Sequence, residues 1–131
     1  MKHTTKSTGD KFEHLACQEL QAHQFDIIAT NWAVAKVGEI DIIARNTTTQ
    51  RHAHPTLICV EVRARRHSQF AQASETVTVA KQKRIIATMQ HFLQAHPEYA
   101  NDEVRFDVMA FDVAIDGNWT LEWIPSAFVG E

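Results

Sequence analysis

The chain has 131 residues, of which 44% are hydrophobic and 22% are charged, and its formal net charge is −3. This length and composition exclude a disordered chain and predict a single domain over 1–131, while the slightly acidic balance does not by itself indicate a nucleic-acid binder. Two cysteines without paired spacing, no apolar run of membrane-span length and no secretory signal favour a reduced, cytoplasmic protein with no membrane partner.

The first predicted elements are a helix and two strands. A helix is expected over 8–24, where Ser7 or Thr8 suits the N-cap and apolar residues recur with the helical period. Strands are expected over 26–34 and over 39–45, the second because of its β-branched residues. The later elements, in chain order, are a polar turn at 46–55, a strand at 57–64, an irregular loop at 67–76, a helix at 78–96, a strand at 104–114, a turn at Asp116-Gly117 and a short strand at 119–124.

This order of elements predicts the fold class. A strand, a helix and another strand follow one another between 57 and 114, which fits a crossover connection. We therefore expect an α/β protein with a mixed β-sheet flanked by α-helices.

Two acidic residues stand inside the most apolar strands. Because strand side chains alternate between faces, Glu39, Asp41 and Ile43 should share one face, and Ile40 and Ile42 the other. In the next strand the same rule places Leu57, Cys59, Glu61 and Arg63 on one face, and Ile58, Val60 and Val62 on the other. If the two strands pair, the two carboxylates converge.

The pair of acids has two interpretations. Two carboxylates in a poorly solvated place repel each other, and a divalent cation such as Mg²⁺ or Mn²⁺ would relieve that repulsion. Alternatively, Asp41 and Glu61 form ion pairs with basic neighbours such as Arg63 or Arg65. The spacing of the acids does not decide between them.

A basic block follows the second acid. Residues 63–84 contain six basic residues and one acidic residue, Glu75; the basic ones are Arg63, Arg65, Arg66, Lys81, Lys83 and Arg84. Such a block either solvates a loop and a helix surface or binds a polyanion next to the acids. On the second interpretation, Arg65 is the better candidate to flank Glu61, because it shares the strand face of Arg63.

The whole pattern resembles a known family. The separation of "GEID" from "VEV" is similar to that in the PD-(D/E)XK nuclease superfamily, and nearly the whole chain resembles the bacterial YraN-like (UPF0102) family, whose members resemble Holliday-junction resolvases in fold. The matching residues are Thr8-Gly9, Glu13, Ala16, Asn31-Trp32, Gly38-Glu39-Ile40-Asp41, Val60-Glu61-Val62, Arg65, Lys81 and Arg105-Phe106-Asp107.

The resemblance implies a restriction-endonuclease-like fold and a set of site residues. It implies that Glu13, Asp41 and Glu61, with the Val62 carbonyl as a fourth ligand, bind Mg²⁺ or Mn²⁺. The sequence supports the first of these in part, because Glu13 lies seven residues before Leu20 and hence on nearly the same helix face, although Glu19 falls in the same arc. Glu39 also matches the family pattern and is expected to face nucleic acid, with a purely structural role as an equal alternative. Within the basic block, Arg65 and Lys81 are the residues expected to bind nucleic acid, unless they only form a solvated surface.

One position departs from the superfamily pattern. The Lys that stands two residues after the Glu in the superfamily is Arg63 here. An arginine cannot act as a general base, although it can bind a phosphate in bidentate fashion. The resemblance therefore implies either a metal-dependent endonuclease with Asp41, Glu61 and Arg63 as catalytic residues, or an impaired nuclease fold that binds nucleic acid or a protein without cleaving. DNA is favoured over RNA as the partner, and a homodimer is an expectation carried over from resolvases.

Overall fold

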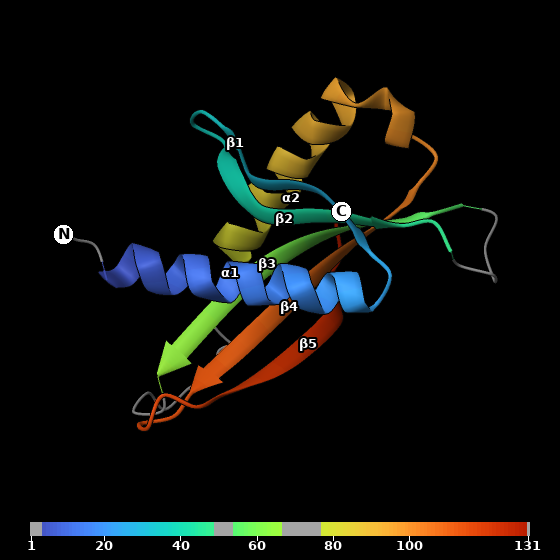
Figure 1. The fold of residues 1–131 in the computed structure, drawn as a ribbon. Coiled ribbons are helices and arrows are strands. Elements are labelled where there is room, and N and C mark those ends of the chain that lie inside the picture. Colours follow the sequence, from blue (N-terminus) through green and yellow to red (C-terminus); the bar gives the residue numbers. More distant parts are fainter. Residues whose placement is uncertain (1–3, 49–53, 67–76, 131) are drawn as a thin grey trace.

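The computed structural model describes residues 4–48, 54–66 and 77–130. In chain order, its elements are α1 (Thr4–Ala22), β1 (Asp26–Val34), β2 (Gly38–Asn46), β3 (Thr56–Arg66), α2 (Val79–Ala95), the short 3₁₀ helix η2 (Pro97–Tyr99), β4 (Glu103–Val113) and β5 (Trp119–Phe128) (Figure 1). Within these residues no helix is long and apolar enough to cross a membrane. The predicted loop at 67–76 and half of the predicted turn at 46–55, residues 49–53, lie outside the described residues.

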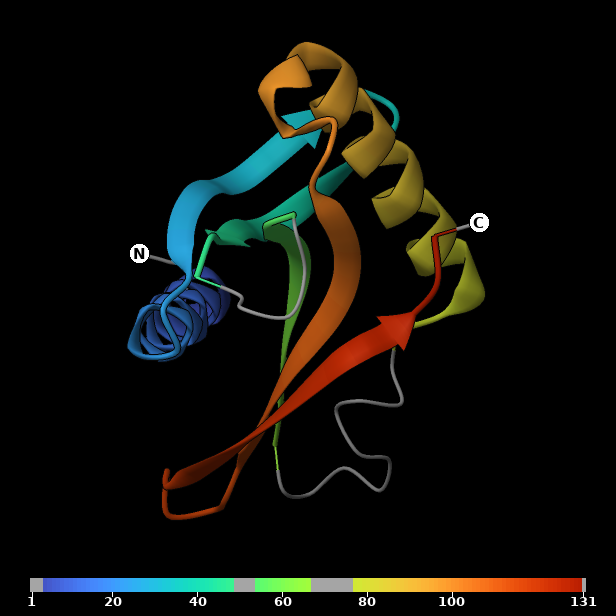
Figure 2. The ribbon, with the colours of Figure 1, turned by 90° about the vertical axis from the view of Figure 1, so that its right-hand side faces the viewer.

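The strands form a single mixed sheet. Its order is β1-β2-β3-β4-β5, and all neighbours are antiparallel except β3 and β4, which run parallel and are joined through α2. Figure 2 shows α1 and α2 on opposite sides of the sheet. The prediction of an α/β protein with a mixed sheet flanked by helices is confirmed, and the architecture is compatible with a restriction-endonuclease-like fold.

The boundaries of α1 differ from those predicted. The helix begins at Thr4, so the predicted N-caps, Ser7 and Thr8, lie inside it. No proline stops the helix from extending past Ser7 and Thr8 toward the N-terminus, so a hydroxyl residue alone was not enough to predict where the helix begins. At the other end the amide of Phe25 bonds to the carbonyl of Leu20 at 3.0 Å, and Gln24 adopts a positive φ of 70°. This is a Schellman motif, and it turns the chain directly into β1.

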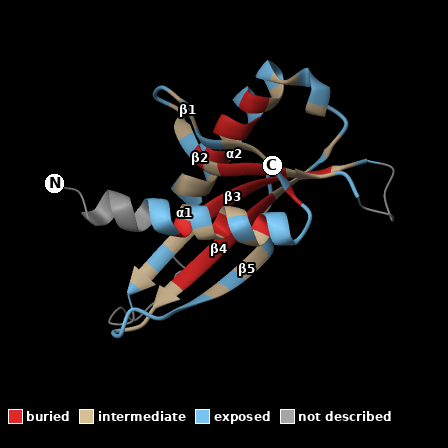
Figure 3. Cartoon of the chain, viewed as in Figure 1, coloured by how far each residue is buried: buried red, intermediate tan, exposed pale blue. Residues whose placement is uncertain are grey.

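Apolar clusters pack on both faces of the sheet. Figure 3 shows the buried residues in red, mainly in β2, β3 and β4 and in parts of α1 and α2. On the α1 side, the buried cluster includes Phe12, Ala16, Leu20, Phe25, Ile42, Ala44, Ile58, Val60, Met109 and Phe111. On the α2 side, it includes Ile40, Ile43, Leu57, Cys59, Ile85, Met89, Phe92 and Phe106. Neither cysteine is in a disulfide, and both pack against these clusters, Cys17 on the α1 side and Cys59 on the α2 side.

The alternation predicted for β2 fails at one residue. Ile42 packs on the α1 side, as Val60 opposite it does, but Ile40 packs on the α2 side together with Ile43. From Ile42 back toward Gly38, β2 no longer pairs with β3, and the β1–β2 hairpin curls toward α2 (Figure 2). The prediction that Ile40 and Ile42 share one face is therefore wrong, because the strand bends between them.

Helix α2 packs closely against the start of β2. A Cβ atom on Gly38 would lie 2.7 Å from the Thr88 hydroxyl oxygen and 3.3 Å from the carbonyl oxygen of Arg84. That hydroxyl is buried and donates a hydrogen bond to the same carbonyl at 2.7 Å. Glycine at this position thus sets the distance between the hairpin and α2.

Substitution of this glycine should therefore destabilise the fold. We expect Gly38→Ala to lower the free energy of unfolding by about 1–3 kcal/mol, because the new methyl group overlaps the Thr88 hydroxyl. Adding Thr88→Ala removes that oxygen, so the double variant should be more stable than the sum of the two single effects indicates. Denaturant unfolding of the four proteins measures the coupling, and strictly additive losses would show that the overlap is not the cause.

A buried carboxylate holds the irregular end of β5. Asp107 on β4 is fully buried, and its two oxygens accept bonds from Arg105 Nε and a terminal guanidinium nitrogen at 2.9 and 2.8 Å. They also accept the Trp123 indole N–H at 2.9 Å and the Ser126 amide at 3.1 Å. The register of β4 and β5 shifts beside Asp107, and Ser126 has a φ of 52°. The carboxylate therefore supplies acceptors where the strand pairing is interrupted.

Candidate functional site

The pairing of β2 and β3 ends next to two acidic residues. The last registered pair is Ile42 with Val60, and the next residue on each strand is Asp41 and Glu61, respectively. Past this point the amide of Val62 donates to Asp41 Oδ2 at 2.9 Å. The side chain of Asp41 thus takes an amide that lies beyond the end of the ladder, and the two carboxylates lie where the strands separate.

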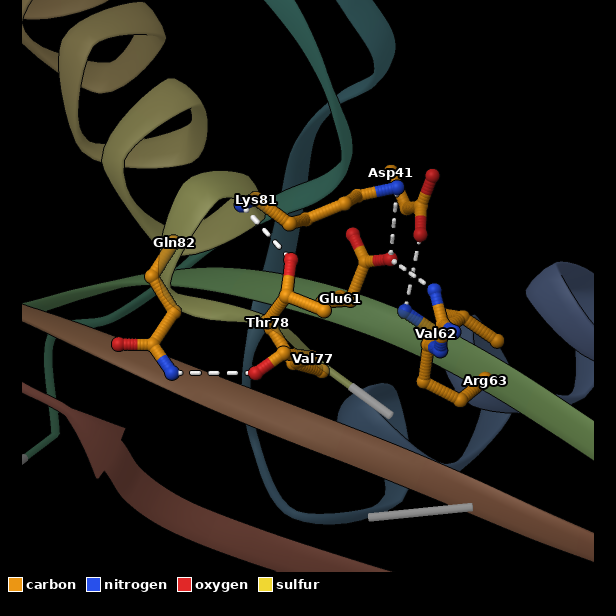
Figure 4. Close-up of polar contacts among 8 residues, drawn as sticks. All are labelled: Asp41, Glu61, Val62, Arg63, Val77, Thr78, Lys81 and Gln82. Atoms are coloured by element: carbon orange, nitrogen blue, oxygen red, sulfur yellow. Dashed lines mark hydrogen bonds and ion pairs between the residues drawn. The ribbon is translucent and has the colours of Figure 1, made fainter. Parts of the chain in front are cut away.

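Glu61 lies between two cations. Its side chain is only 4% exposed, and its Oε2 atom is 3.3 Å from Arg63 Nη1 and 3.3 Å from Lys81 Nζ. Figure 4 shows the side chains of Asp41, Glu61 and Lys81 converging from β2, β3 and α2. The ion-pair interpretation is therefore observed for Glu61 with Arg63, and a lysine from the second helix joins the pair.

The start of α2 positions Lys81. Thr78 is the N-cap, and its hydroxyl accepts the Lys81 amide at 3.1 Å. The side-chain amide of Gln82 donates to the Val77 carbonyl at 3.2 Å, which further holds this first turn (Figure 4). The cap fixes the direction in which α2 leaves the preceding chain and so places the lysine over β3.

The pKa of Asp41 is raised from an ordinary value of 3.8 to about 7, and burial is the largest cause. The negative charge of Glu61 acts in the same direction, whereas the Val62 amide, which favours the ionised form, lowers the pKa. A smaller increase comes from the charge of Glu13 and from a hydrogen bond with Glu61. Asp41 therefore titrates near neutral pH in the folded protein, beside a carboxylate that is already matched by two cations.

Glu13 approaches this pair from α1. Burial raises its pKa, and the charges of Asp10, Glu39 and Glu61 contribute in the same direction. The Asn31 side-chain amide donates to Glu13 Oε1 at 3.2 Å and lowers the pKa. Asn31 belongs to β1 and has a left-handed φ of 50°, a conformation that asparagine tolerates better than most residues.

The described residues contain no group of three His, Cys, Asp or Glu side chains arranged to hold a metal ion. The structure brings Asp41 and Glu61 together, and the charge of Glu13 raises the pKa of Asp41, but the three do not form one compact ligand set among the described residues. Val62 contributes its amide to Asp41, and Glu39 is exposed. The first ligands available to a metal ion at this position would be the carboxylates of Asp41 and Glu61.

The basic block divides into separate groups. Arg63 and Lys81 contact Glu61, whereas Arg65 and Arg66 line a hollow of about 320 Å³ together with Lys11 of α1. The other two basic residues, Lys83 and Arg84, are exposed on α2. Of the six cations, only two therefore contact the carboxylate pair within the described residues.

Three contributors lay outside the sequence-based site. Thr78 directly precedes the apolar period of α2, so a capping argument could have found it. Asn31 gave no local signal for its contact, because its side chain meets Glu13 only after β1 and α1 have packed together. Lys11 is far from the basic block in sequence and joins Arg65 and Arg66 only in the fold.

Comparison with known proteins gives consistent matches. The model of the family described as "Uncharacterised protein family UPF0102" matches residues 12–111. A UPF0102 protein of Psychrobacter cryohalolentis is 43% identical, with 92% of this chain and 79% of that protein covered. The corresponding values are 40%, 84% and 62% for Psychrobacter arcticus, and 34%, 95% and 96% for Francisella tularensis subsp. novicida. With a family model across most of its length and relatives above 30% identity, this chain belongs to the UPF0102 family.

Proposed function

We propose that this protein is a metal-dependent nuclease that hydrolyses phosphodiester bonds in nucleic acid, with branched or structured DNA as the favoured substrate. The observation that supports it is the pair formed by Asp41 and Glu61 at the separation of β2 and β3, with the pKa of Asp41 raised to about 7. Strongly perturbed carboxylates with a specific charged neighbour are typical of functional sites.

The chemistry of the donors suits a hard divalent cation. Mg²⁺ keeps several waters and is usually held by one or two carboxylates together with substrate phosphates, so two facing carboxylates suffice. Asp41 and Glu61 would hold Mg²⁺ or Mn²⁺, with Glu13 and the Val62 carbonyl as further ligands. When bound, such an ion supplies charge neutralisation of the phosphate and acidification of a water.

The cations next to the carboxylates would bind the substrate. Arg63 and Lys81 both lie 3.3 Å from Glu61, and each can exchange part of that contact for a phosphate oxygen. Lys81 thus presents an ammonium group at the carboxylate from α2, while Arg63 occupies the strand position and stays protonated. Substrate binding would draw both cations from the acid to the phosphate and leave Glu61 for a metal.

One observation favours a second candidate. Glu61 already has two cationic partners, and no three-ligand group is formed by the described residues. A domain with this arrangement could bind nucleic acid or a protein partner without cleavage. The two candidate functions differ in whether nucleic acid is cleaved when a divalent ion is present, so a single cleavage assay distinguishes them.

A nuclease assay tests the proposal. The parent protein with Mn²⁺ or Mg²⁺ should cleave at least one of branched, single-stranded or duplex DNA, and EDTA should stop the reaction. Glu61→Gln should lower the rate at least about 100-fold, because it removes one charged ligand from the site. A matched control, Glu122→Gln, changes an exposed acid on β5 and should cleave as the parent does.

Two results would contradict cleavage by this site. Equal rates for the parent and Glu61→Gln would assign the activity to another site or to a contaminant. Binding of DNA by the parent without any cleavage in either metal would support the module that binds and does not cut. Circular dichroism of each variant shows whether a lost rate reflects a lost fold.

A further inference from the structure

The hollow between α1 and the distal ends of β3 and β4 is the second concentration of positive charge. Among the described residues, it is lined by Lys11, Phe12, Ala64, Arg65, Arg66, Val113 and Gly117, of which three are basic and none is acidic. Its volume of about 320 Å³ lies within the range of small-ligand pockets. The lining therefore combines three basic side chains with the apolar side chains of Phe12, Ala64 and Val113.

Three cations gather at this hollow. Within the described residues, none of Lys11, Arg65 and Arg66 forms an ion pair, whereas Arg45, Arg63, Lys81 and Arg105 each do. Lys11 lies with its Nζ atom 5.6 Å from the centre of the Phe12 ring, which holds the ammonium beside the hollow. Like charges brought together repel one another, so an anion in the hollow would relieve an unfavourable arrangement.

The hollow and the carboxylate site share their supporting elements. Lys11 and Glu13 stand on the same helix, and Arg65 lies four residues after Glu61 on β3, a separation of about 13 Å along an extended strand. That length corresponds to about four base-pair steps along a duplex. A nucleic-acid strand with one phosphate at Arg63 and Lys81, beside Glu61, would therefore have another phosphate within reach of the hollow.

We propose that this hollow is a phosphate subsite that holds the nucleic-acid backbone a few nucleotides away from the carboxylate pair. Lys11, Arg65 and Arg66 bind the phosphate oxygens, and the hydrocarbon of Ala64 and Val113 contacts the sugar. The subsite rests on the nucleic-acid role proposed above. It adds a second anchoring point that fixes the direction in which the strand crosses the site.

Salt dependence of binding tests the subsite. Fluorescence anisotropy with a short single strand and with a duplex, in EDTA so that no cleavage occurs, gives the slope of log affinity against log salt. Each neutralised phosphate contributes about 0.9 to this slope for duplex DNA and about 0.7 for a single strand. Lys11→Gln and Arg66→Gln should each reduce the slope by about one such contact. Both residues are exposed, so their substitution should leave the fold intact.

Lys83→Gln is the matched control. It removes the same charge from an exposed lysine of α2, outside the hollow, and should keep the parent slope. Equal slopes in the parent and both hollow variants would overturn the subsite while Glu61-dependent cleavage still stood. Equal reductions in all three variants would show a general charge effect and would overturn it too. A parent protein that binds neither DNA at low salt would refute the subsite and the proposed function together.

Discussion

Asp41→Asn should make the metal-free protein more stable at neutral pH, although it removes a site residue. We expect the free energy of unfolding to rise by about 2–4 kcal/mol at pH 8. In the folded protein, burial and the charge of Glu61 raise the pKa of Asp41 to about 7, whereas its ordinary value is 3.8. Asparagine keeps an oxygen that can accept the Val62 amide but carries no charge.

The direction of the pH dependence follows from proton binding. Between about pH 4 and pH 7, the folded protein keeps Asp41 protonated, while the unfolded chain ionises it. The folded state then binds more protons, so stability falls as the pH rises through this window and levels off above the folded pKa. The advantage of Asp41→Asn should therefore be near zero at pH 4 and largest above pH 7.

Denaturant unfolding in EDTA at several pH values measures this effect. Asp26→Asn, at an exposed acid at the start of β1, serves as the matched control and should retain the pH slope of the parent. An Asp41→Asn variant that is less stable than the parent at pH 8, or that has the same pH slope, would show that ionising Asp41 does not destabilise the folded protein.

Asp107→Ala should have the opposite effect on stability. The carboxylate is fully buried and accepts four hydrogen bonds, from Arg105, Trp123 and the Ser126 amide. Its removal leaves a guanidinium, an indole N–H and a backbone amide without their acceptor. Breaking a buried ion pair from one side typically costs about 3–5 kcal/mol, and we expect a loss of that size.

Thermal and denaturant unfolding will show the loss directly. Glu122→Ala on the neighbouring strand removes an exposed acid and should change stability by no more than about 0.5 kcal/mol. The loss at Asp107 should also be accompanied by greater exposure of Trp123, which its fluorescence reports. A folded Asp107→Ala protein with parental stability would mean that water replaces the carboxylate at no cost.

The sequence predicted most of the fold because hydrophobic periodicity and turn residues mark long elements well. The strand at 26–34 was predicted with its observed bounds, and the helix at 78–96 differs by one residue at each end. The last strand was predicted only to residue 124, but it continues to Phe128 past Pro125. Asp107 makes that continuation possible by bonding to the Ser126 amide, a contact between distant residues that local patterns do not contain.

The candidate site shows the same division between local and long-range information. Alternation predicted that Glu61 and Arg63 share one face of β3, and in the structure Arg63 and Lys81 of α2 both contact the acid. Strict alternation missed the bend of β2 at Ile40, because that bend depends on packing between elements. The contact between Asn31 and Glu13 also depends on such packing, and no motif indicated it. The basic block was visible in the sequence, but its separation into distinct groups was not.

The separation of β2 from β3 has one more consequence, for solubility. Strand β3 continues to Arg66 past its last pairing with β2, and there β4 is its only partner among the described strands. An open strand edge of this kind can add a strand from another molecule and begin aggregation. Charged side chains oppose such pairing, and this segment carries Arg63, Arg65 and Arg66. The separation of β2 from β3 therefore exposes a strand edge, and the arginines on that edge oppose edge-to-edge polymerisation.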